Sequence, residues 1–375
     1  MVSTPGSTID SGFRMTISPL PHGQPPTTTS PQLGGAVNVR ARETPPKRKR
    51  ARITTTEAKS AVSDTSASDI APARHAPRNR PWIAGLANAT RFVLKRTPLP
   101  VLHAAGGVVG RLLAATANSS RRHTRVNLSL CFPDATPERR RQIERRSLSH
   151  LARAAFELPR FWASDKSAIQ NMVRKVHGQE YLDAGLASKH GLLLASAHVG
   201  SWEFLGLWFS TLHKTVGLYQ RPRIKQFDEV TLAGRCRFGG RMLQASSASL
   251  RELIRALRRN ECVWMMADQV PTKGAGLWAR FFGRPALTGT LLPRLVSHTG
   301  AAVVWAYAER LPRGQGFDIH FFPADADIRS PKIEQALGAM NQDAEQLVRR
   351  CPEQYLWRYR RFRRTSDGTP SPYQR

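Results

Sequence analysis

From about residue 190 onward the chain alternates between two kinds of hydrophobic pattern. Short apolar runs bounded by glycine or polar residues predict buried strands, and stretches with apolar side chains three and four positions apart predict helices. The predicted strands are residues 192–197, 215–219, 241–245, 263–267, 301–308 and 317–322. The predicted helices are residues 202–209, 249–260, 291–298 and 333–350. Such alternation favours an α/β fold, with a mixed, mostly parallel sheet flanked by helices.

The N-terminal half has a different character. Residues 1–80 are rich in Pro, Ser and Thr, include a basic run at 47–52, and are predicted to form a disordered tail. Residues 81–165 read as helical; Thr136 and Pro137 mark one helix start, and Pro159 is predicted to end or kink that helix. The α/β domain is expected over residues 166–365, followed by a flexible C-terminus at 366–375.

The apolar stretch at residues 98–117 has two interpretations. Pro100, three glycines and Arg111 interrupt it, so it falls short of a convincing membrane span. Because basic residues flank it on both sides, it is compatible with an amphipathic segment that associates with a membrane. It is equally compatible with a helical hairpin packed on the main body.

Charge narrows the class of partner. The net charge is +30, of which residues 1–80 carry only +7, so the rest of the chain is itself strongly basic. Such a protein is expected to meet polyanions: nucleic acid, anionic lipid headgroups, or phosphorylated or acidic protein substrates. The four cysteines are widely separated and form no C-x-x-C pair, so the sequence predicts no zinc site.

Candidate chemistry begins at the end of the strand at 192–197. His198 follows the strand directly, Gly200 and Ser201 break it, and Glu203 falls in the first turn of the next helix. A strand-end imidazole facing an early-turn carboxylate is suited to general-base catalysis, with the carboxylate fixing the ring tautomer. The alternative is a hydrogen-bonded structural histidine and a glutamate that favours the helix N-terminus.

Other polar residues lie at the ends of predicted elements in the same region. Arg221 follows the strand at 215–219, Arg235 and Arg237 follow a stretch with a helical pattern, and Asp268 and Gln269 end the strand at 263–267. Ligand crevices in open α/β sheets form at strand ends, so all five residues are candidates for binding substrate, and the arginines for binding phosphates or stabilising an oxyanion. Each of them could equally be a surface arginine, and Asp268 a helix cap or an arginine partner.

Near the end of the chain, aromatic residues are interleaved with arginines at 352–364. This composition suits nucleic-acid binding and suits a membrane interface equally well.

Seven short motifs, in this order, resemble the late acyltransferases of lipid A biosynthesis, the lauroyl/myristoyl-transferase family, within the lysophospholipid acyltransferase superfamily. They are Asn127-Leu-Ser-Leu-Cys-Phe-Pro133, Ala197-His-Val-Gly-Ser-Trp-Glu203, Tyr219-Gln-Arg-Pro222, Arg235-Cys-Arg237, Asp268-Gln269, Phe281-Phe-Gly283 and Pro352-Glu-Gln-Tyr-Leu-Trp-Arg-Tyr-Arg-Arg-Phe362. The resemblance covers about residues 98–364. A clear hydrophobic anchor, usual in this family, is broken up here, which favours peripheral attachment.

The resemblance implies that a fatty acyl chain moves from an acyl carrier protein thioester to a hydroxyl of a Kdo-linked lipid A precursor. It places this reaction at the cytoplasmic face of the inner membrane, on an anionic lipid surface. His198 would be the base and Glu203 its partner; Arg235, and after it Arg221, would stabilise the oxyanion. The thioester is already activated, so neither a metal nor another cofactor is required, and no nucleic acid is expected.

Two other functions remain open at this stage. A related acyltransferase could use another acceptor, such as a lysophospholipid, an ornithine lipid or another glycolipid. The basic charge alone would also fit a nucleic-acid-binding protein, although charge-driven binding does not need a histidine and a carboxylate in an α/β crevice.

Overall fold

The computed structural model describes residues 93, 96–220, 225–271 and 276–374. The N-terminal tail predicted to be disordered lies outside the described residues, as does Arg221.

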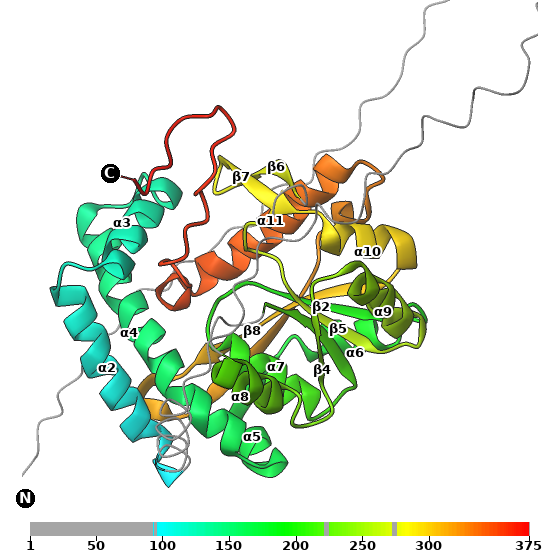
Figure 1. The fold of residues 1–375 in the computed structure, drawn as a ribbon, viewed down its shortest axis with the longest axis horizontal. Helices are drawn as coiled ribbons and strands as arrows, with labels where there is room; N and C mark the ends of the chain where they lie inside the picture. The colour runs from blue at the N-terminus through cyan, green and yellow to red at the C-terminus, as the bar shows by residue number, and fades with distance from the viewer. Residues whose placement is uncertain (1–92, 94–95, 221–224, 272–275, 375) are drawn as a thin grey trace, which may run out of the picture. The chain divides into compact units, whose positions relative to one another are not determined.

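A seven-stranded sheet forms the centre of the described part (Figure 1). Its order is β1-β9-β8-β2-β5-β3-β4, and β8–β9 is the one antiparallel pair between neighbouring strands of this sheet. The strands are β1 Val173–His177, β2 Leu192–Ser196, β3 Thr215–Tyr219, β4 Arg241–Gln244, β5 Cys262–Met266, β8 Ala302–Arg310 and β9 Phe317–Pro323. The predicted mixed, mostly parallel sheet is therefore confirmed, with strand ends within two residues of those expected.

Two features of the strand pattern escaped prediction. β1 is an edge strand whose last four residues are exposed, so it lacks the apolar run that marks a buried strand. Residues 281–288, for which no strand was predicted, belong to a hairpin of β6 Gly276–Phe281 and β7 Arg284–Gly289. Phe282 and Gly283 make its turn with φ of 50° and 72°, and a Phe in the left-handed region is not a recognised hairpin signal.

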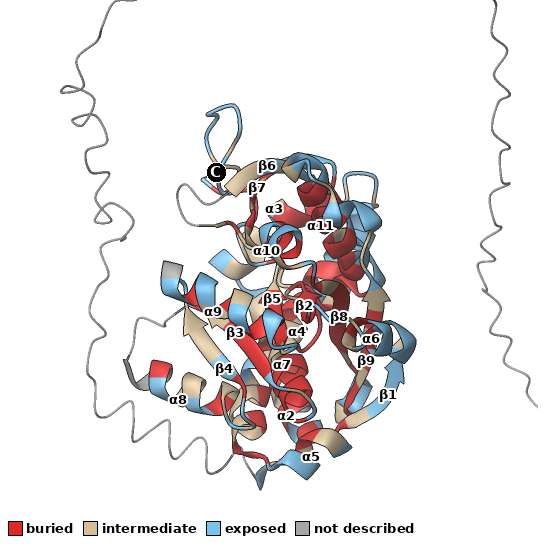
Figure 2. Ribbon diagram, turned by 90° about the vertical axis from the view of Figure 1, so that its right-hand side faces the viewer, coloured by how far each residue is buried: buried red, intermediate tan, exposed pale blue. Residues whose placement is uncertain are grey.

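Helices cover both faces of the sheet. Because successive strand side chains point to opposite faces, Leu193 and Ala195 enter one hydrophobic core while Leu192 and Leu194 enter the other. The helices of the α/β part are α5 Lys166–Asn171, which precedes β1, and then α6 Gln179–Leu186, α7 Trp202–Ser210, α8 Lys225–Arg235, α9 Ser247–Arg258, α10 Leu291–Thr299 and α11 Ile333–Arg350, with the 3-10 turns η1 Pro312–Gly314, η2 Ala326–Arg329 and η3 Pro352–Gln354. Figure 2 shows β2, β5 and α7 as buried elements and β1 as exposed.

The N-terminal helices are α2 Leu99–Ala115, α3 Ser119–Cys131 and α4 Pro137–Ala163. Thr136 caps α4 by accepting a hydrogen bond from the Arg139 N–H, as predicted. Pro159 does not end the helix, which continues to Ala163. The proline lies in the last turns, where it removes one hydrogen bond, while the buried Phe161 holds the following residues in the core.

Close helix packing decides the position of α2. A Cβ on Gly110 would lie 2.2 Å from the Ser149 Cα, so glycine allows α2 to approach the backbone of α4. The other face of α2 leaves Val101, Val108 and Leu112 exposed. Of the described helices, none alone has the length and composition of a membrane span; α2 and α3 together would, but they are bent by 76°.

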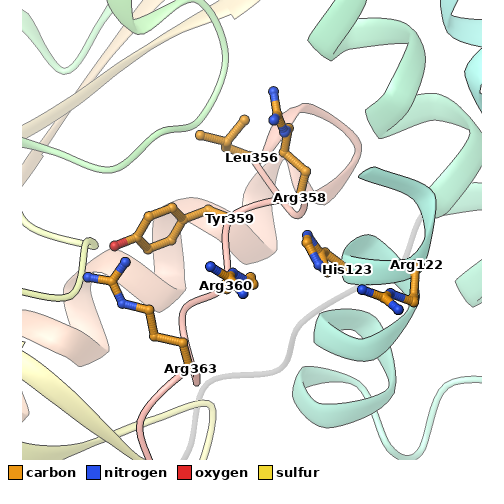
Figure 3. Close-up of a pocket in the computed structure, with 7 residues that line it drawn as sticks. All are labelled: Arg122, His123, Leu356, Arg358, Tyr359, Arg360 and Arg363. Carbon is orange, nitrogen blue, oxygen red and sulfur yellow. The ribbon is translucent and has the colours of Figure 1, made fainter. Parts of the chain in front are cut away.

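The chain end also packs against α3. Tyr373 is buried, donates a hydrogen bond from its hydroxyl to Asn127 Oδ1 and accepts one from the Phe362 N–H at 3.1 Å. Tyr373 thus anchors the end of the chain to α3, while the flexibility predicted for residues 366–375 stays a prediction. The Asn127 amide also donates to the carbonyls of Trp357 and Tyr359, which fixes the aromatic and arginine-rich segment beside α3 (Figure 3).

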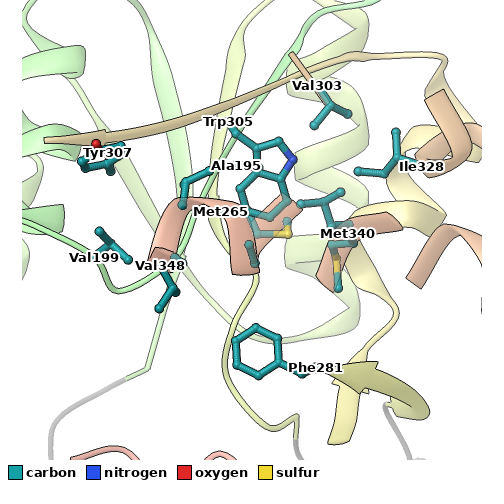
Figure 4. Close-up of a cluster of buried hydrophobic side chains, with 14 of the residues drawn as sticks. Ala195, Val199, Met265, Phe281, Val303, Trp305, Tyr307, Ile328, Met340 and Val348 are labelled. Atoms are coloured by element: carbon teal, nitrogen blue, oxygen red, sulfur yellow. The ribbon is translucent and has the colours of Figure 1, made fainter. Parts of the chain in front are cut away.

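One hydrophobic core joins these parts. Leu128 of α3 and Ile143 of α4 belong to the same buried cluster as Trp305 of β8 and Met340 of α11. Figure 4 shows part of this cluster, with Trp305 on the sheet facing Met340 and Phe281 below. The N-terminal helices and the sheet are therefore held by shared burial rather than by separate cores.

Candidate active site

The turn between β2 and α7 is held on two sides. The Ser201 N–H donates to the Ala308 carbonyl of β8 at 2.8 Å, and the Gly200 N–H donates to the Gln354 carbonyl at 3.1 Å. Gly200 has φ +64°, and a Cβ there would meet the Ala308 oxygen at 2.0 Å. Only glycine fits this turn, which presents His198 at the end of the strand.

His198 and Asp268 meet because their strands are neighbours in register. β2 pairs with β5 in parallel, with Ser196 opposite Met266, so the residues two positions beyond stand side by side. Asp268 Oδ1 lies 2.7 Å from His198 Nδ1, and Asp268 Oδ2 accepts from the His198 backbone N–H at 3.1 Å. One carboxylate therefore fixes both the ring and the main chain of the histidine.

This geometry selects a ring tautomer. A carboxylate only accepts hydrogen bonds, so Nδ1 carries the proton and Nε2 keeps its lone pair. The Gln269 amide nitrogen lies 3.0 Å from Nε2 and donates to it. The Trp202 ring packs edge-on against the imidazole, with ring centroids 5.2 Å apart. The basic nitrogen Nε2 thus faces the Gln269 amide, a side chain that a substrate hydroxyl could displace. The rest of the ring is held in place by Asp268 and Trp202.

The electrostatics of Asp268 support this arrangement. Burial by itself would raise the pKa of its carboxyl, but the charge and hydrogen bonds of His198 outweigh burial and lower the pKa. Nearby, burial first and Asp268 second raise the pKa of Tyr355 well above its ordinary value. Asp268 therefore stays ionised beside the imidazole, and Tyr355 stays a neutral phenol.

Glu203 does not hold the histidine ring, which corrects the sequence-based prediction. Its carboxylate makes a bidentate ion pair with Arg235, in which Nε donates at 2.9 Å and Nη2 donates to the second oxygen. This pairing raises the pKa of Arg235 even though burial opposes it. α7 begins at Trp202 and carries the Glu203 side chain toward α8, while the parallel strand brings Asp268 to Nδ1.

The remaining predicted site residues are placed as follows. Asp268 and Gln269 both contact His198, where they had been predicted only to bind substrate. Arg237 donates to the Trp162 carbonyl of α4 at 3.1 Å and stands over the Phe238 ring. Arg221 lies outside the described residues, so its role stays a prediction.

A buried ion network below the turn was not predicted at all. Glu157 of α4 is fully buried and accepts from Arg310 of β8, with Nη2 at 2.9 Å. It also contacts the His103 ring of α2 and accepts from the Ser201 hydroxyl at 3.2 Å. Burial would raise the pKa of Glu157, but Arg310 and His103 lower it. Since these residues are far apart in the sequence, no local pattern could have linked them.

A strand-end imidazole held by a carboxylate is an arrangement that can transfer a proton. The comparisons with known proteins define the class further: the family model for bacterial lipid A biosynthesis acyltransferases matches residues 72–364. The chain belongs to this family, and it is an acyltransferase.

Three relatives illustrate the range of the family. The chain is 26% identical over 295 residues to the lipid A biosynthesis lauroyltransferase of Escherichia coli K12, covering 78% of this chain and 95% of that protein. It is 24% identical over 301 residues to the lipid A biosynthesis myristoyltransferase of the same organism, covering 79% and 91%. It is also 27% identical over 192 residues to the phosphatidylinositol mannoside acyltransferase of Mycobacterium tuberculosis, covering 50% and 60%.

Proposed function

We propose that this protein transfers a fatty acyl chain from the thioester of an acyl carrier protein to a hydroxyl of a Kdo-linked lipid A precursor. The observation that carries the proposal is the state of His198: Nδ1 is held by the buried Asp268, and Nε2 is left as a base. Membership of the lipid A acyltransferase family supports the same reaction class.

The geometry supports a direct transfer. The acceptor hydroxyl takes the place of the Gln269 amide at Nε2, which removes the proton as the oxygen attacks the thioester carbon. Asp268 stabilises the imidazolium that forms. When the tetrahedral intermediate collapses, the C–S bond breaks and the imidazolium returns the proton to the leaving thiolate. Arg235, fixed by Glu203, is our candidate donor to the oxyanion.

The charge of the protein supports the proposed partners. Carrier proteins are acidic, so a strongly basic surface favours their docking and speeds encounter. The phosphates and sugar acids of the acceptor are a second set of anions that this surface is suited to bind.

We further propose that the enzyme acts on the cytoplasmic face of the inner membrane. Supporting this placement is the exposed apolar face of α2, formed by Val101, Val108 and Leu112, with Arg111 exposed on the same helix. An apolar face flanked by basic groups binds an anionic lipid surface. Vesicles containing anionic lipid should retain the full chain, and a V101S/V108S/L112S variant should be retained less; equal retention would contradict this placement.

The reaction is tested with purified full-length enzyme, an acyl carrier protein thioester and a Kdo-linked precursor. His198→Ala should lower kcat by about 10²-fold or more, the range of general-base help. His298→Ala is the matched control, because His298 is exposed on α10. Wild-type enzyme that leaves the precursor unacylated would refute the proposed acceptor, and a fully active His198→Ala would refute the proposed base.

A second candidate acceptor follows from one comparison. The partial match to a phosphatidylinositol mannoside acyltransferase shows that family resemblance extends to a relative with a different glycolipid in its name. Offering the enzyme a mannosylated phospholipid beside the lipid A precursor separates the two, since the preferred acceptor has the higher kcat/KM.

A further inference from the structure

An arginine-lined pocket opens between α3 and the C-terminal segment, outside the His198 site. Its volume is about 560 Å³, and Figure 3 shows side chains from both elements around it. The lining residues are Arg122, His123, Leu356, Arg358, Tyr359, Arg360 and Arg363. Four guanidinium groups around one hollow are a strong concentration of positive charge.

This charge is not neutralised by the described part of the protein. Arg122, Arg358 and Arg360 make no ion pair with a described carboxylate, and Arg363 stands over the Tyr359 ring at 6.0 Å. Arg241, by contrast, is shared between two glutamates. Clustered arginines without carboxylate partners are suited to bind an anion, and their planar groups match phosphate oxygens in pairs.

The pocket is also preorganised. Asn127 lies one helical turn after His123 on α3, and its amide holds the carbonyls of Trp357 and Tyr359. Arg358 and Arg360 are exposed, whereas Trp357 is buried on the core side of the same segment. The arginines are therefore carried by a backbone that is fixed before any ligand arrives, which lowers the entropic cost of binding.

The same segment contacts the two loops of the active site. The Leu356 N–H donates to the His198 carbonyl at 3.0 Å, and the Tyr359 hydroxyl accepts from the Val270 N–H at 2.9 Å. Val270 follows Asp268 and Gln269 directly. The C-terminal segment that lines the pocket is therefore the same segment that contacts the backbone of His198 and the loop after Gln269.

The pKa of His123 reflects the positive charge of the pocket. Its pKa is lowered, first by burial and then by the charges of Arg360 and Arg122. A bound anion would offset those charges. The histidine is therefore an internal probe of occupancy.

We infer that this pocket binds a phosphate monoester carried by the saccharide of the acceptor and so positions the acceptor hydroxyl at His198. This inference rests on the proposed function. A hollow of this size takes a sugar phosphate, whereas a carrier protein docks on a broader surface. The phosphodiester of a carrier's prosthetic arm has one negative charge, whereas a monoester has up to two and therefore neutralises more of the charge of the four guanidinium groups.

The kinetic test uses the R358Q/R360Q variant. The KM for the phosphorylated acceptor should rise roughly 10- to 100-fold, as expected for the loss of charge-assisted hydrogen bonds, and the KM for the thioester donor should not change. With an acceptor lacking the phosphate, wild type and variant should have the same raised KM. The control is R251Q/R258Q, which removes two exposed charges from α9. A raised donor KM, or no change in acceptor KM, would overturn the inference.

A binding test does not depend on acyl transfer. N-acetylglucosamine 1-phosphate should raise the NMR-measured pKa of His123 in the full chain, and neutral N-acetylglucosamine should leave it unchanged. The shift should vanish in R358Q/R360Q. An equal shift with inorganic phosphate at the same concentration would mean that the sugar is not recognised, and no shift would mean that the pocket does not bind the monoester; either result overturns the inference.

If the precursor is never acylated but the sugar phosphate binds, only the proposed function fails.

Discussion

The Asp268→Asn substitution tests which of two carboxylates, Asp268 or Glu203, is the functional partner of His198. In the structure, Asp268 accepts from both the Nδ1–H and the backbone N–H of His198, and its side chain is 2% exposed. Asparagine keeps the shape but has one acceptor oxygen. If that oxygen keeps the backbone hydrogen bond, the amide NH₂ faces Nδ1 and forces the proton onto Nε2.

The expected loss follows from this change of tautomer. A ring protonated on Nε2 cannot take a proton from the acceptor, and a buried neutral amide no longer stabilises the imidazolium. General-base help is worth about 10² to 10⁴ in rate, which corresponds to about 3 to 5 kcal/mol of barrier. We therefore expect kcat to fall by at least about 10²-fold, with little change in the KM for either substrate.

The assay combines steady-state kinetics with the ¹⁵N NMR shifts of the His198 ring, which report the tautomer directly. Glu203→Gln is the matched control. It breaks the ion pair with Arg235, so stability and rate should fall while the ring of His198 stays protonated on Nδ1. If Asp268→Asn keeps wild-type kcat, or if Glu203→Gln is the variant that changes the tautomer, the assignment of the partner is refuted.

Three further predictions concern the support of the site and the fold. Arg310→Met leaves the Glu157 carboxylate buried without its cation and should cost about 3 to 5 kcal/mol in the free energy of unfolding, measured with urea. Gly200→Ala would place a Cβ 2.0 Å from the Ala308 oxygen, so the turn must shift; a misplacement of about 1 Å should lower kcat about 10²-fold. Burial raises the pKa of Asp343 from 3.8 to about 6, so the protonated acid is favoured in the folded state and stability is lost as pH rises through that window. Asp343→Asn should therefore stabilise the protein more at pH 7 than at pH 4, by an amount on the order of 2 kcal/mol, measured by urea unfolding at the two pH values.

Each of these predictions has a control and a result that would refute it. R310M/E157Q should recover part of the stability lost in Arg310→Met, and a double variant no more stable than the single would argue against an unpaired buried charge. Gly283→Ala is the control for Gly200, because it has a similar positive φ but nothing within 4 Å of the added Cβ; equal losses of kcat would refute the steric explanation. A stability gain from Asp343→Asn that does not change with pH would show that titration is not its cause.

Much of the fold follows from local pattern. The strand β3 and the helix α11 have the predicted bounds, because an apolar run and a 3.6-residue stripe each report burial without knowledge of the partner. Where burial does not set the pattern, prediction failed: β1 is exposed, and the β6–β7 hairpin turns through Phe282 in a conformation that phenylalanine rarely adopts.

The site was predicted less completely. The sequence drew attention to His198, Asp268 and Gln269 separately, since each follows an apolar strand. It paired the histidine with Glu203, the carboxylate nearest along the chain. The observed partner is 70 residues away, and only the order of strands in the sheet shows it.

By itself, the sequence determined that this protein is an α/β acyltransferase of the lipid A family with a histidine at the end of a buried strand, because periodicity and motifs are local properties of a chain. The tertiary structure alone decided which carboxylate holds that histidine, which charges are buried under its turn, and that Asn127 of α3 fixes an arginine pocket beside it. These contacts depend on strand order and helix packing, which join residues far apart in the sequence, and a one-dimensional pattern carries no information about which distant partner is chosen.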